Sequence, residues 1–522
     1  MGPGCGAVKP WSGWKGSLTG YRLVQEVARS CPASCRIPQD RLHAYLPELS
    51  GNRENCFKPP LILLYSHACR EEDVADYDVI IVGSGPAGIF AALELSKKKL
   101  KVLIVEKGAD LPDRSRKDLF FGWGGAGAFS DGKLNLSTEV GGFLIDYMDE
   151  VSLKELIDYV DSLYLEFGAP KELKGMDRKE TVRVEEAAAR AGLRLVPFAI
   201  RHLGTDRCVG VLERIRAALE ARGVHMRFRT EVRDIVVEGG RVRGVRTTDG
   251  AVFGSEFVIL APGRAGSHWL ETVAGEIGLA TATNPVDIGV RVEVPASVLR
   301  PVTDIMHEAK FTYNSRRFDD SVRTFCMNPY GVVVKERHEG FCTVNGHSFS
   351  VRKSENTNFA ILVSTTFTEP FHQPIAYGRY IANLANLLGG GIIVQRLGDL
   401  LHGRRSTPDR IRRNTVKPTL TDATPGDLSF VIPYRYITDI IEMLCVLDRV
   451  TPGINATSTL LYGVEVKFYS MRLRIEPTME TEVANLFAAG DGAGVTRGIV
   501  QASVSGVVAA REILRRTHGR AT

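Results

Sequence analysis

The segment 77–106 restricts the fold more than any other part of the chain. Tyr77–Val82 is apolar apart from Asp78, as expected of a parallel strand that is buried on both faces. A helix is expected over Ile89–Lys98 and a second buried strand over Val102–Val105. This order predicts a βαβ unit. Between the first strand and the helix lies a glycine-rich turn, Gly83-Ser84-Gly85-Pro86-Ala87-Gly88.

Each glycine of this turn has a separate task. Gly83 permits the tight turn, Gly85 lets the backbone approach a pyrophosphate, and Gly88 lets helix and strand pack closely. The unpaired N–H groups at the helix N-terminus then face the phosphates. Glu106 ends the second strand and is expected to accept hydrogen bonds from a ribose. We therefore predict a bound dinucleotide with contacts from Gly83, Ser84, Gly85, Pro86, Ala87, Gly88, Glu106 and Lys107.

A second motif lies at the other end of the sequence. A strand is expected over Leu486–Ala489, followed by a glycine-rich turn and a helix from about Gly498. The Asp491 carboxylate suits a ribityl hydroxyl, and the positive end of the helix suits the flavin pyrimidine, where negative charge forms on reduction. The dinucleotide is thus predicted to be FAD. The expected contacts from this motif are Gly490, Asp491, Gly498 and Ile499.

A third glycine-rich segment, Gly122–Leu134, leaves little side chain between its backbone and a ligand. Its contacts to flavin or phosphate are predicted at Gly124, Gly125 and Ser130, and Lys133 is a further polar group within reach. A flexible surface loop is the alternative interpretation of this segment.

These motifs resemble FAD proteins of the glutathione-reductase-like superfamily, in which GxGxxG opens the domain and Gly-Asp-Gly closes it. The strand meander 225–253, followed by Ala261-Pro262-Gly263, is similar to the middle element of that superfamily. The resemblance implies that Ala261 and Gly263 lie beside the FAD, and that the backbone of Val232 contacts the adenine.

Residues 77–516 also resemble a narrower family, the FAD-dependent dehydrogenases often labelled NAD(FAD)-utilising. The resemblance implies FAD as cofactor, but it implies no particular substrate. The segments that carry it are Gly122–Leu134, Arg201–Asp206, Phe325–Pro329, Val344–Ser348 and Val394–Asp399.

The expected fold class is α/β. It consists of a Rossmann-like FAD-binding domain with three-layer architecture and an inserted α+β substrate or cap domain. The predicted division is an N-terminal extension 1–72, an FAD-binding domain 73–275 and 476–518, and a cap domain 276–475. Strands are expected over Ala251–Phe253, over Phe257–Leu260 and through 285–367, with a turn at Asn345-Gly346.

Several absences bear on the function. There is no second GxGxxG after a strand and no CxxC near the flavin, so neither a separate NAD(P) domain nor dithiol chemistry is expected. The electron partner, whether NAD(P)H, a quinone or O₂, must then reach the flavin through the substrate cleft. The net charge of +5 does not indicate a nucleic-acid partner, and no apolar run is long enough to cross a bilayer.

The location and the N-terminal extension are less constrained. Nine cysteines without a disulfide framework favour a reducing compartment, the cytoplasm. Residues 1–72 are basic and interrupted by Pro and Gly, which leaves a tail, an organellar transit peptide or a start-site artefact. The spacing of the cysteines and the histidine in this extension fits no familiar zinc module, so no metal site is predicted. The residues considered for zinc are Cys31, Cys35, Cys56, His67 and Cys69.

No catalytic acid or base stands out in the sequence. The favoured hypothesis is a dehydrogenase or reductase that transfers a hydride between flavin and an unidentified small molecule. A flavin monooxygenase and a non-catalytic FAD-binding scaffold are the alternatives, and the oligomeric state is not predicted. The candidates for substrate contact, each also explicable as a structural polar residue, are His202, Arg264, His268, Asn328, Tyr330, His347 and Tyr462.

Overall fold

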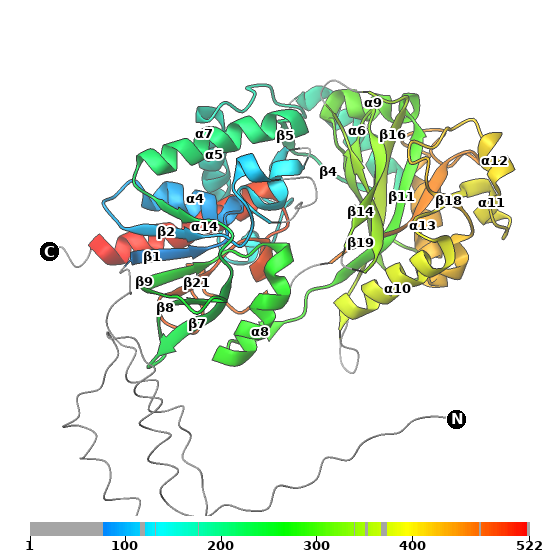
Figure 1. Cartoon of the computed structure of the whole chain (residues 1–522). Coiled ribbons are helices and arrows are strands. Elements are labelled where there is room, and N and C mark those ends of the chain that lie inside the picture. The colour runs from blue at the N-terminus through cyan, green and yellow to red at the C-terminus, as the bar shows by residue number, and fades with distance from the viewer. Residues whose placement is uncertain are drawn as a thin grey trace, which may run out of the picture. The chain divides into compact units, whose positions relative to one another are not determined.

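The computed structural model describes residues 77–114, 121–130, 132–175, 177–338, 340–349, 353–366, 373–468 and 471–518. The N-terminal extension 1–72, with its cysteines, lies outside the described residues. Two large sheets organise the described chain (Figure 1). One is built from the two ends of the sequence and the other mainly from its middle.

The first sheet has the strand order β6-β2-β1-β9-β8-β7, with β21 beside β9. The strands β6, β2, β1, β9 and β21 run parallel, whereas β7 and β8 form an antiparallel extension. The carboxyl ends of the parallel strands therefore meet at one edge. The strands are β1 (Tyr77–Val82), β2 (Val102–Val105), β6 (His225–Arg227), β7 (Val232–Glu238), β8 (Arg241–Thr247), β9 (Val252–Leu260) and β21 (Leu486–Ala488).

Helices cover one face of this sheet, and the folded-over β7–β8 extension and α8 (Ser267–Ile277) cover the other. In the helical layer, α14 (Ile499–His518) lies against α4 (Pro86–Leu95), so a C-terminal helix packs beside the helix that follows β1 (Figure 1). The three-layer prediction is confirmed. The other two helices of this layer are α5 (Glu150–Glu166) and α7 (Thr205–Ala221).

The second sheet has the order β18-β17-β19-β11-β16-β13-β12-β4 and is antiparallel except for the β17–β18 pair. Together with its helices it is called the cap here. Its strands are β4 (Arg194–Val196), β11 (Val286–Pro295), β12 (Lys310–Asn314), β13 (Ser321–Asn328), β16 (Asn356–Thr365), β17 (Ile393–Arg396), β18 (Thr424–Pro425) and β19 (Leu460–Lys467).

The central strand β11 divides its side chains between two environments. Every second residue from Val286 to Val294 is apolar and joins the core formed with the cap helices. The intervening Asp287, Arg291 and Glu293 are equally buried but point to the opposite, polar side. The helices that contribute to the apolar core are α6 (Arg178–Ala191), α9 (Ala296–Met306), α10 (Pro374–Gly389) and α13 (Tyr434–Leu447).

Smaller elements complete the described chain. Short antiparallel pairs join β3 to β5, β10 to β20 and β14 to β15. The strands are β3 (Lys133–Leu136), β5 (Ala199–His202), β10 (Thr281–Ala282), β14 (Val332–Arg337), β15 (Cys342–His347) and β20 (Arg472–Leu473). The short helices are α11 (Leu397–Leu401), α12 (Pro408–Arg412) and the 3₁₀ turns η4 (Leu111–Asp113), η5 (Gly125–Phe129), η6 (Leu144–Asp146), η7 (Arg264–Gly266), η8 (Leu428–Phe430) and η9 (Asp491–Ala493).

Two local expectations were wrong. Asn345-Gly346 is not a turn but lies inside β15, paired with Val334 and Val333. Gly346 serves close packing there, because a Cβ would lie 2.1 Å from the Asn358 Oδ1. The two strands expected over 251–253 and 257–260 are the single strand β9, since pairing with β8 and then with β1 leaves no break between them.

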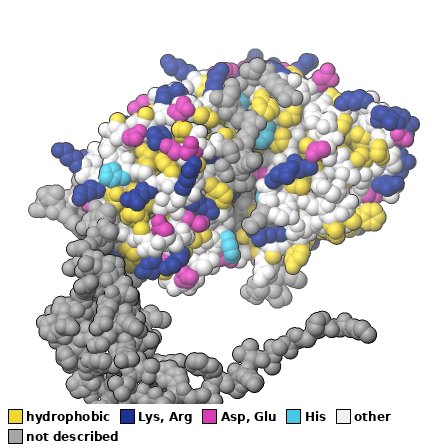
Figure 2. All heavy atoms as spheres, in the orientation of Figure 1, with side chains coloured by type: hydrophobic (Ala, Val, Ile, Leu, Met, Phe, Trp, Pro, Cys, Tyr) yellow, Lys and Arg dark blue, Asp and Glu magenta, His cyan; other side chains and the backbone are white. Residues whose placement is uncertain are grey.

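The division into domains stays a prediction, to which the strand order adds one detail. β4 belongs to the cap sheet, although it comes from the segment 73–275. Among the described residues no helix is both long and apolar enough to cross a membrane. Basic and acidic side chains are interspersed over the described part of the face drawn in Figure 2.

Candidate active site

A cavity of about 420 Å³ lies at the carboxyl edge of the parallel strands and extends to the cap. All predicted cofactor contacts line it, except Gly88 and Gly124. Segments near both ends of the sequence thus meet in one cavity, because β1, β9 and β21 are neighbours in the sheet. The volume is typical of a small-molecule site.

The turn after β1 has the backbone geometry of a phosphate cradle. Gly83 has a φ of 103°, and a Cβ there would lie 2.2 Å from the Ala261 carbonyl oxygen. A Cβ at Gly88 would lie 2.0 Å from the Gly83 carbonyl oxygen, so Gly88 is a packing residue behind the cavity. Gly85 has no neighbour within 4 Å of its Cβ position, which leaves its backbone accessible from the cavity. These features fit a pyrophosphate at the N-terminus of α4.

Glu106 has a structural task as well as the predicted one. Its Oε2 accepts hydrogen bonds from the Ser84 N–H at 2.9 Å and the Ser84 hydroxyl at 2.8 Å. Its Oε1 accepts from the backbone N–H groups of Gly108 at 2.8 Å and Gly122 at 2.9 Å. Four donors use the full acceptor capacity of the carboxylate. Glu106 therefore ties the first glycine turn to the third glycine-rich segment, and a ribose hydroxyl would have to share an acceptor with Ser84.

The third glycine-rich segment lies beside the first. A Cβ at Gly125 would lie 3.2 Å from the Gly85 Cα, and Gly125 has a φ of 55°. The Arg114 Nη1 donates to the carbonyl oxygens of Trp123 at 2.5 Å and Gly125 at 3.0 Å, which fixes the turn. Gly124 faces away from the cavity and packs against Leu212. The segment is thus an ordered wall of the cavity.

The C-terminal motif forms the adjoining wall. The Asp491 Oδ1 accepts from the Thr496 hydroxyl at 2.8 Å, and its Oδ2 lies 3.7 Å from the Arg264 Nε. The Gln501 side chain donates to the carbonyl oxygens of Thr138 and Val140, both at 3.2 Å. The N-terminus of α14 is therefore tied to the segment 137–142, which also lines the cavity.

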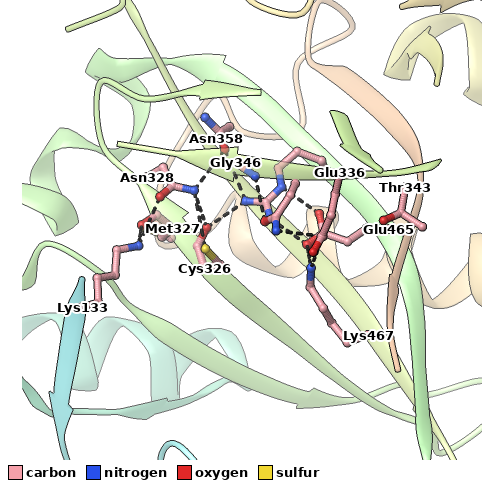
Figure 3. Close-up of polar contacts among 12 residues, drawn as sticks. Lys133, Cys326, Met327, Asn328, Glu336, Thr343, Gly346, Asn358, Glu465 and Lys467 are labelled. Atoms are coloured by element: carbon pink, nitrogen blue, oxygen red, sulfur yellow. Dashed lines mark hydrogen bonds and ion pairs between the residues drawn. The ribbon is translucent and has the colours of Figure 1, made fainter. Parts of the chain in front are cut away.

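The cap end of the cavity carries several charges. Lys133, from β3, reaches across to the cap, where its ammonium donates to the Met327 carbonyl oxygen at 2.7 Å and the Asn328 Oδ1 at 3.2 Å (Figure 3). It also forms an ion pair with Glu308 at 3.1 Å. Lys133 was considered for flavin or phosphate, but its ammonium instead joins the two parts of the cavity wall. The other charged residues of this end are Glu139, Lys310, Arg323 and Arg497.

Behind this wall lies a polar network that includes Cys326, Asn358 and Glu465 (Figure 3), and Arg291 is hydrogen-bonded to all three. The Arg291 guanidinium donates to both carboxylate oxygens of Glu465 and to the Cys326 carbonyl oxygen at 2.8 Å. Asn328 connects the network to Lys133, because its Nδ2 also donates to the Cys326 carbonyl oxygen, at 2.9 Å. Cys326 has a φ of 47°, a conformation that is costly for a side chain other than glycine and that surrounding structure must hold in place.

Lys310, which lines this cavity, has a pKa far from its ordinary value. Burial lowers the pKa of its ammonium to about 8, and repulsion from Arg323 contributes in the same direction. Glu308 and Glu139 act in the opposite direction, while Arg497 adds to the repulsion. Within the described residues the Lys310 side chain forms no hydrogen bond or ion pair.

Of the seven residues proposed for substrate contact, only Arg264 lines the cavity. The His268 side chain is 88% exposed on α8, and the Tyr462 hydroxyl donates to Glu293 inside the cap at 2.5 Å. Tyr330 lies under the Lys353 ammonium, 5.1 Å from its ring centre. The remaining candidates are His202, whose ring packs at a tilt against His307, Asn328, which binds Lys133, and His347, which lies in β15.

Sequence reasoning missed the charged residues of the cap end. Lys310 and Arg323 lie on β12 and β13, strands in which apolar and polar residues alternate in the ordinary way. Nothing in such a sequence distinguishes a lysine that faces a cavity from one that faces solvent. Arg497 offered a signal, because it stands between Gly494 and Gly498 of the C-terminal motif.

Comparison with known proteins supports the prediction that the cofactor is FAD. Residues 78–333 match the FAD dependent oxidoreductase family, and residues 285–468 match the FAD-dependent protein, C-terminal domain-like family. An uncharacterized protein of Clostridium beijerinckii is 29% identical over 473 residues, which cover 84% of this chain and 80% of that protein.

Solved structures resemble the chain more distantly. Glycine oxidase from Geobacillus kaustophilus is 16% identical, with a TM-score of 0.37 over 84% of this chain and 95% of that one. L-proline dehydrogenase from P. horikoshii is 13% identical, with a TM-score of 0.39 over 85% and 95%. Likenesses at this level do not bear on the substrate. The two family matches together extend over residues 78–468 and both describe FAD-dependent proteins, so the chain is an FAD-dependent oxidoreductase.

Proposed function

We propose that this enzyme is a dehydrogenase or reductase whose small-molecule substrate binds at the cap end of the cavity. One observation carries the proposal: all predicted cofactor contacts except Gly88 and Gly124 line the same cavity as the charged cap residues Lys310 and Arg323. A cofactor held along the glycine-rich walls would thus share one cavity with a substrate held by the cap.

The glycine-rich walls would hold the cofactor. Gly85 and the N-terminus of α4 would receive the pyrophosphate, and Val232, Ala261 and Gly263 would lie beside the adenosine half. Asp491, Gly498 and Ile499 would lie beside the flavin half. FAD supplies hydride chemistry when bound. The chain's own contribution is to orient both molecules and to exclude water.

The electron partner and location are part of the same proposal. NAD(P)H, a quinone or O₂ would use the cap end of the cavity, because the sequence holds no second dinucleotide motif. The resemblance to the NAD(FAD)-utilising dehydrogenases is compatible with NAD(P)H as the electron partner. We place the enzyme in the cytoplasm, since the described cysteines Cys342 and Cys445 form no disulfide bond.

The first experiment measures flavin content. The purified protein is expected to be yellow and to release FAD on denaturation. Gly85→Trp is expected to abolish FAD retention, because the indole would occupy the open space above the turn. Gly275→Trp is the matched control, since Gly275 lies exposed on α8, away from the cavity. Equal flavin content in the two variants would contradict the placement of the pyrophosphate.

The second experiment identifies the reaction. Under anaerobic conditions NADH, NADPH and candidate substrates are screened for bleaching of the flavin absorption. Bleaching by a substrate and reoxidation by a quinone, NAD(P)⁺ or O₂ without an oxygenated product is the expected result. A C4a-hydroperoxide intermediate and an oxygenated product would identify a monooxygenase instead.

A further inference from the structure

Some of the charged side chains at the cap end of the cavity form ion pairs, whereas Lys310 forms none with a described residue. Lys133 is paired with Glu308 at 3.1 Å. Arg323 is paired with Asp287, which lies behind it in β11. Glu139 is paired with Arg194, on β4. Lys310 has no such partner among the described residues, although its side chain lines the same space.

An unmatched ammonium in a partly buried position is costly to the fold. A lysine that serves only structure is expected to pair with a carboxylate or to reach solvent. Lys310 forms no such pair with a described residue and is only partly exposed, and its neighbours Arg323 and Arg497 add to its positive surroundings. A bound anion would compensate the charge. The arrangement is therefore complementary to a ligand that brings its own negative charge.

From this geometry we infer that the cap end binds a carboxylate of the substrate, with Lys310 as its counter-ion and Arg323 beside it. The inference rests on the proposed function, because it takes the cap end to be the substrate side of the cavity. A singly charged carboxylate fits better than a phosphate. Glu308 and Glu139 also face this space and would repel the second charge of a phosphate.

Proton binding by Lys310 sets a pH limit on this affinity. The groups that face it are Arg323, Glu308, Arg497 and Glu139, and its pKa is lowered to about 8, first by burial and then by Arg323. Below pH 8 the ammonium is present and binding is at full strength. Above pH 8 the charge is lost, and Kd is expected to rise by about tenfold per pH unit, as proton linkage requires.

The experiment measures carboxylate binding to the yellow holoenzyme. Acetate, propionate and benzoate are compared with the corresponding neutral amides and with inorganic phosphate at constant ionic strength. Binding is followed by perturbation of the flavin absorption and by thermal shift. At least one carboxylate is expected to bind, its amide to bind at least tenfold more weakly, and phosphate to bind more weakly than that carboxylate.

Variants then assign the effect to the lysine. Lys310→Met is expected to weaken carboxylate binding at least tenfold at pH 7 and to remove its dependence on pH. Lys310→Arg is expected to keep binding and to extend it to pH 9.5, because a guanidinium stays charged there. Lys154→Met, on the exposed face of α5, is the control and is expected to match the wild type.

Several results would overturn the inference. They are equal binding of carboxylates and amides, tighter binding of phosphate than of every carboxylate, no perturbation by any carboxylate, and unchanged affinity in Lys310→Met. Loss of FAD from Lys310→Met would instead assign Lys310 to the cofactor. A wild-type protein that is colourless and refuses FAD would contradict the proposed function, which is a separate outcome from a yellow protein without carboxylate binding.

Discussion

Arg291 and Glu465 form a bidentate ion pair in the interior of the cap. The Arg291 Nε lies 2.7 Å from the Glu465 Oε2, and its Nη2 lies 2.6 Å from the Oε1, with both side chains wholly buried. The same guanidinium donates to the backbone of Cys326, which lines the cavity. The pair thus supports the cavity wall from behind.

Arg291→Met is expected to lower the free energy of unfolding by about 3–5 kcal/mol, because it leaves the Glu465 carboxylate buried without its main partner. Replacing both residues with methionine is expected to recover much of this loss, since neither charge is then buried alone. Denaturant unfolding of the two single variants and the double variant forms the cycle. Strictly additive losses would show that the two charges do not interact.

Substitution by methionine is expected to change the melting temperature at pH 7 in opposite directions at Lys133 and at Lys310. Lys133→Met leaves Glu308 buried without its counter-ion and should lower the melting temperature. Lys310→Met removes an unmatched buried charge and should raise it. Thermal unfolding of both variants is the measurement, and a loss of stability in Lys310→Met would contradict the absence of a stabilising partner.

The gain in Lys310→Met should depend on pH in a defined direction. The pKa of Lys310 is lowered to about 8 in the folded protein, below its ordinary value of 10.5. Between these values the unfolded chain binds more protons, so wild-type stability rises with pH there relative to the variant. The advantage of the variant is therefore largest below pH 8 and shrinks as the pH approaches 10.5. Melting curves from pH 7 to 10 give the measurement.

Two helical glycines should respond oppositely to alanine. A Cβ at Gly506, on α14, would lie 2.0 Å from the Ala87 carbonyl oxygen, so Gly506→Ala would force α14 away from α4. A loss of more than about 1 kcal/mol is expected, as for overpacking. Gly275 on α8 has nothing within 4 Å of its Cβ position, and Gly275→Ala should stabilise by about 0.5–1 kcal/mol. Denaturant unfolding compares them, and a neutral Gly506→Ala would disprove the tight contact.

Asp439 provides a test at acidic pH. Burial raises its pKa to about 6, and the neighbouring Asp320, which is paired with Arg435, adds to the shift. Between pH 4 and 6 the folded protein binds more protons at Asp439 than the unfolded chain does, so this group lowers stability as the pH rises through that window. Asp439→Asn should therefore be more stable than wild type at pH 7, with a difference that narrows toward pH 4. Melting temperatures across that range measure it.

Much of the nucleotide fold was readable because its signals are local. The run Tyr77–Val82, the glycines of the following turn and Glu106 lie within thirty residues, and each reflects a backbone requirement that only certain residues meet. The C-terminal motif was equally clear, and its strand and helix begin close to the predicted positions. The turn predicted at Asn345-Gly346 was wrong, because glycine is needed at position 346 by the close approach of side chains from β11, β13 and β16 and not by a local turn.

Composition and motif spacing by themselves determined a nucleotide fold with a glycine-lined site for a dinucleotide. They could do so because tight turns and close backbone approach to a ligand require glycine at particular positions. Only the tertiary structure decided which charges line the cap end of the cavity. Lys133 was a polar group within reach of flavin or phosphate, and its ammonium binds the cap, while Lys310 and Arg323 enter the cavity from strands without any motif. The physical reason is that a lysine's role depends on what surrounds its ammonium, and those neighbours come together only through the pairing of β12 with β13 and the packing of the cap on the cofactor site.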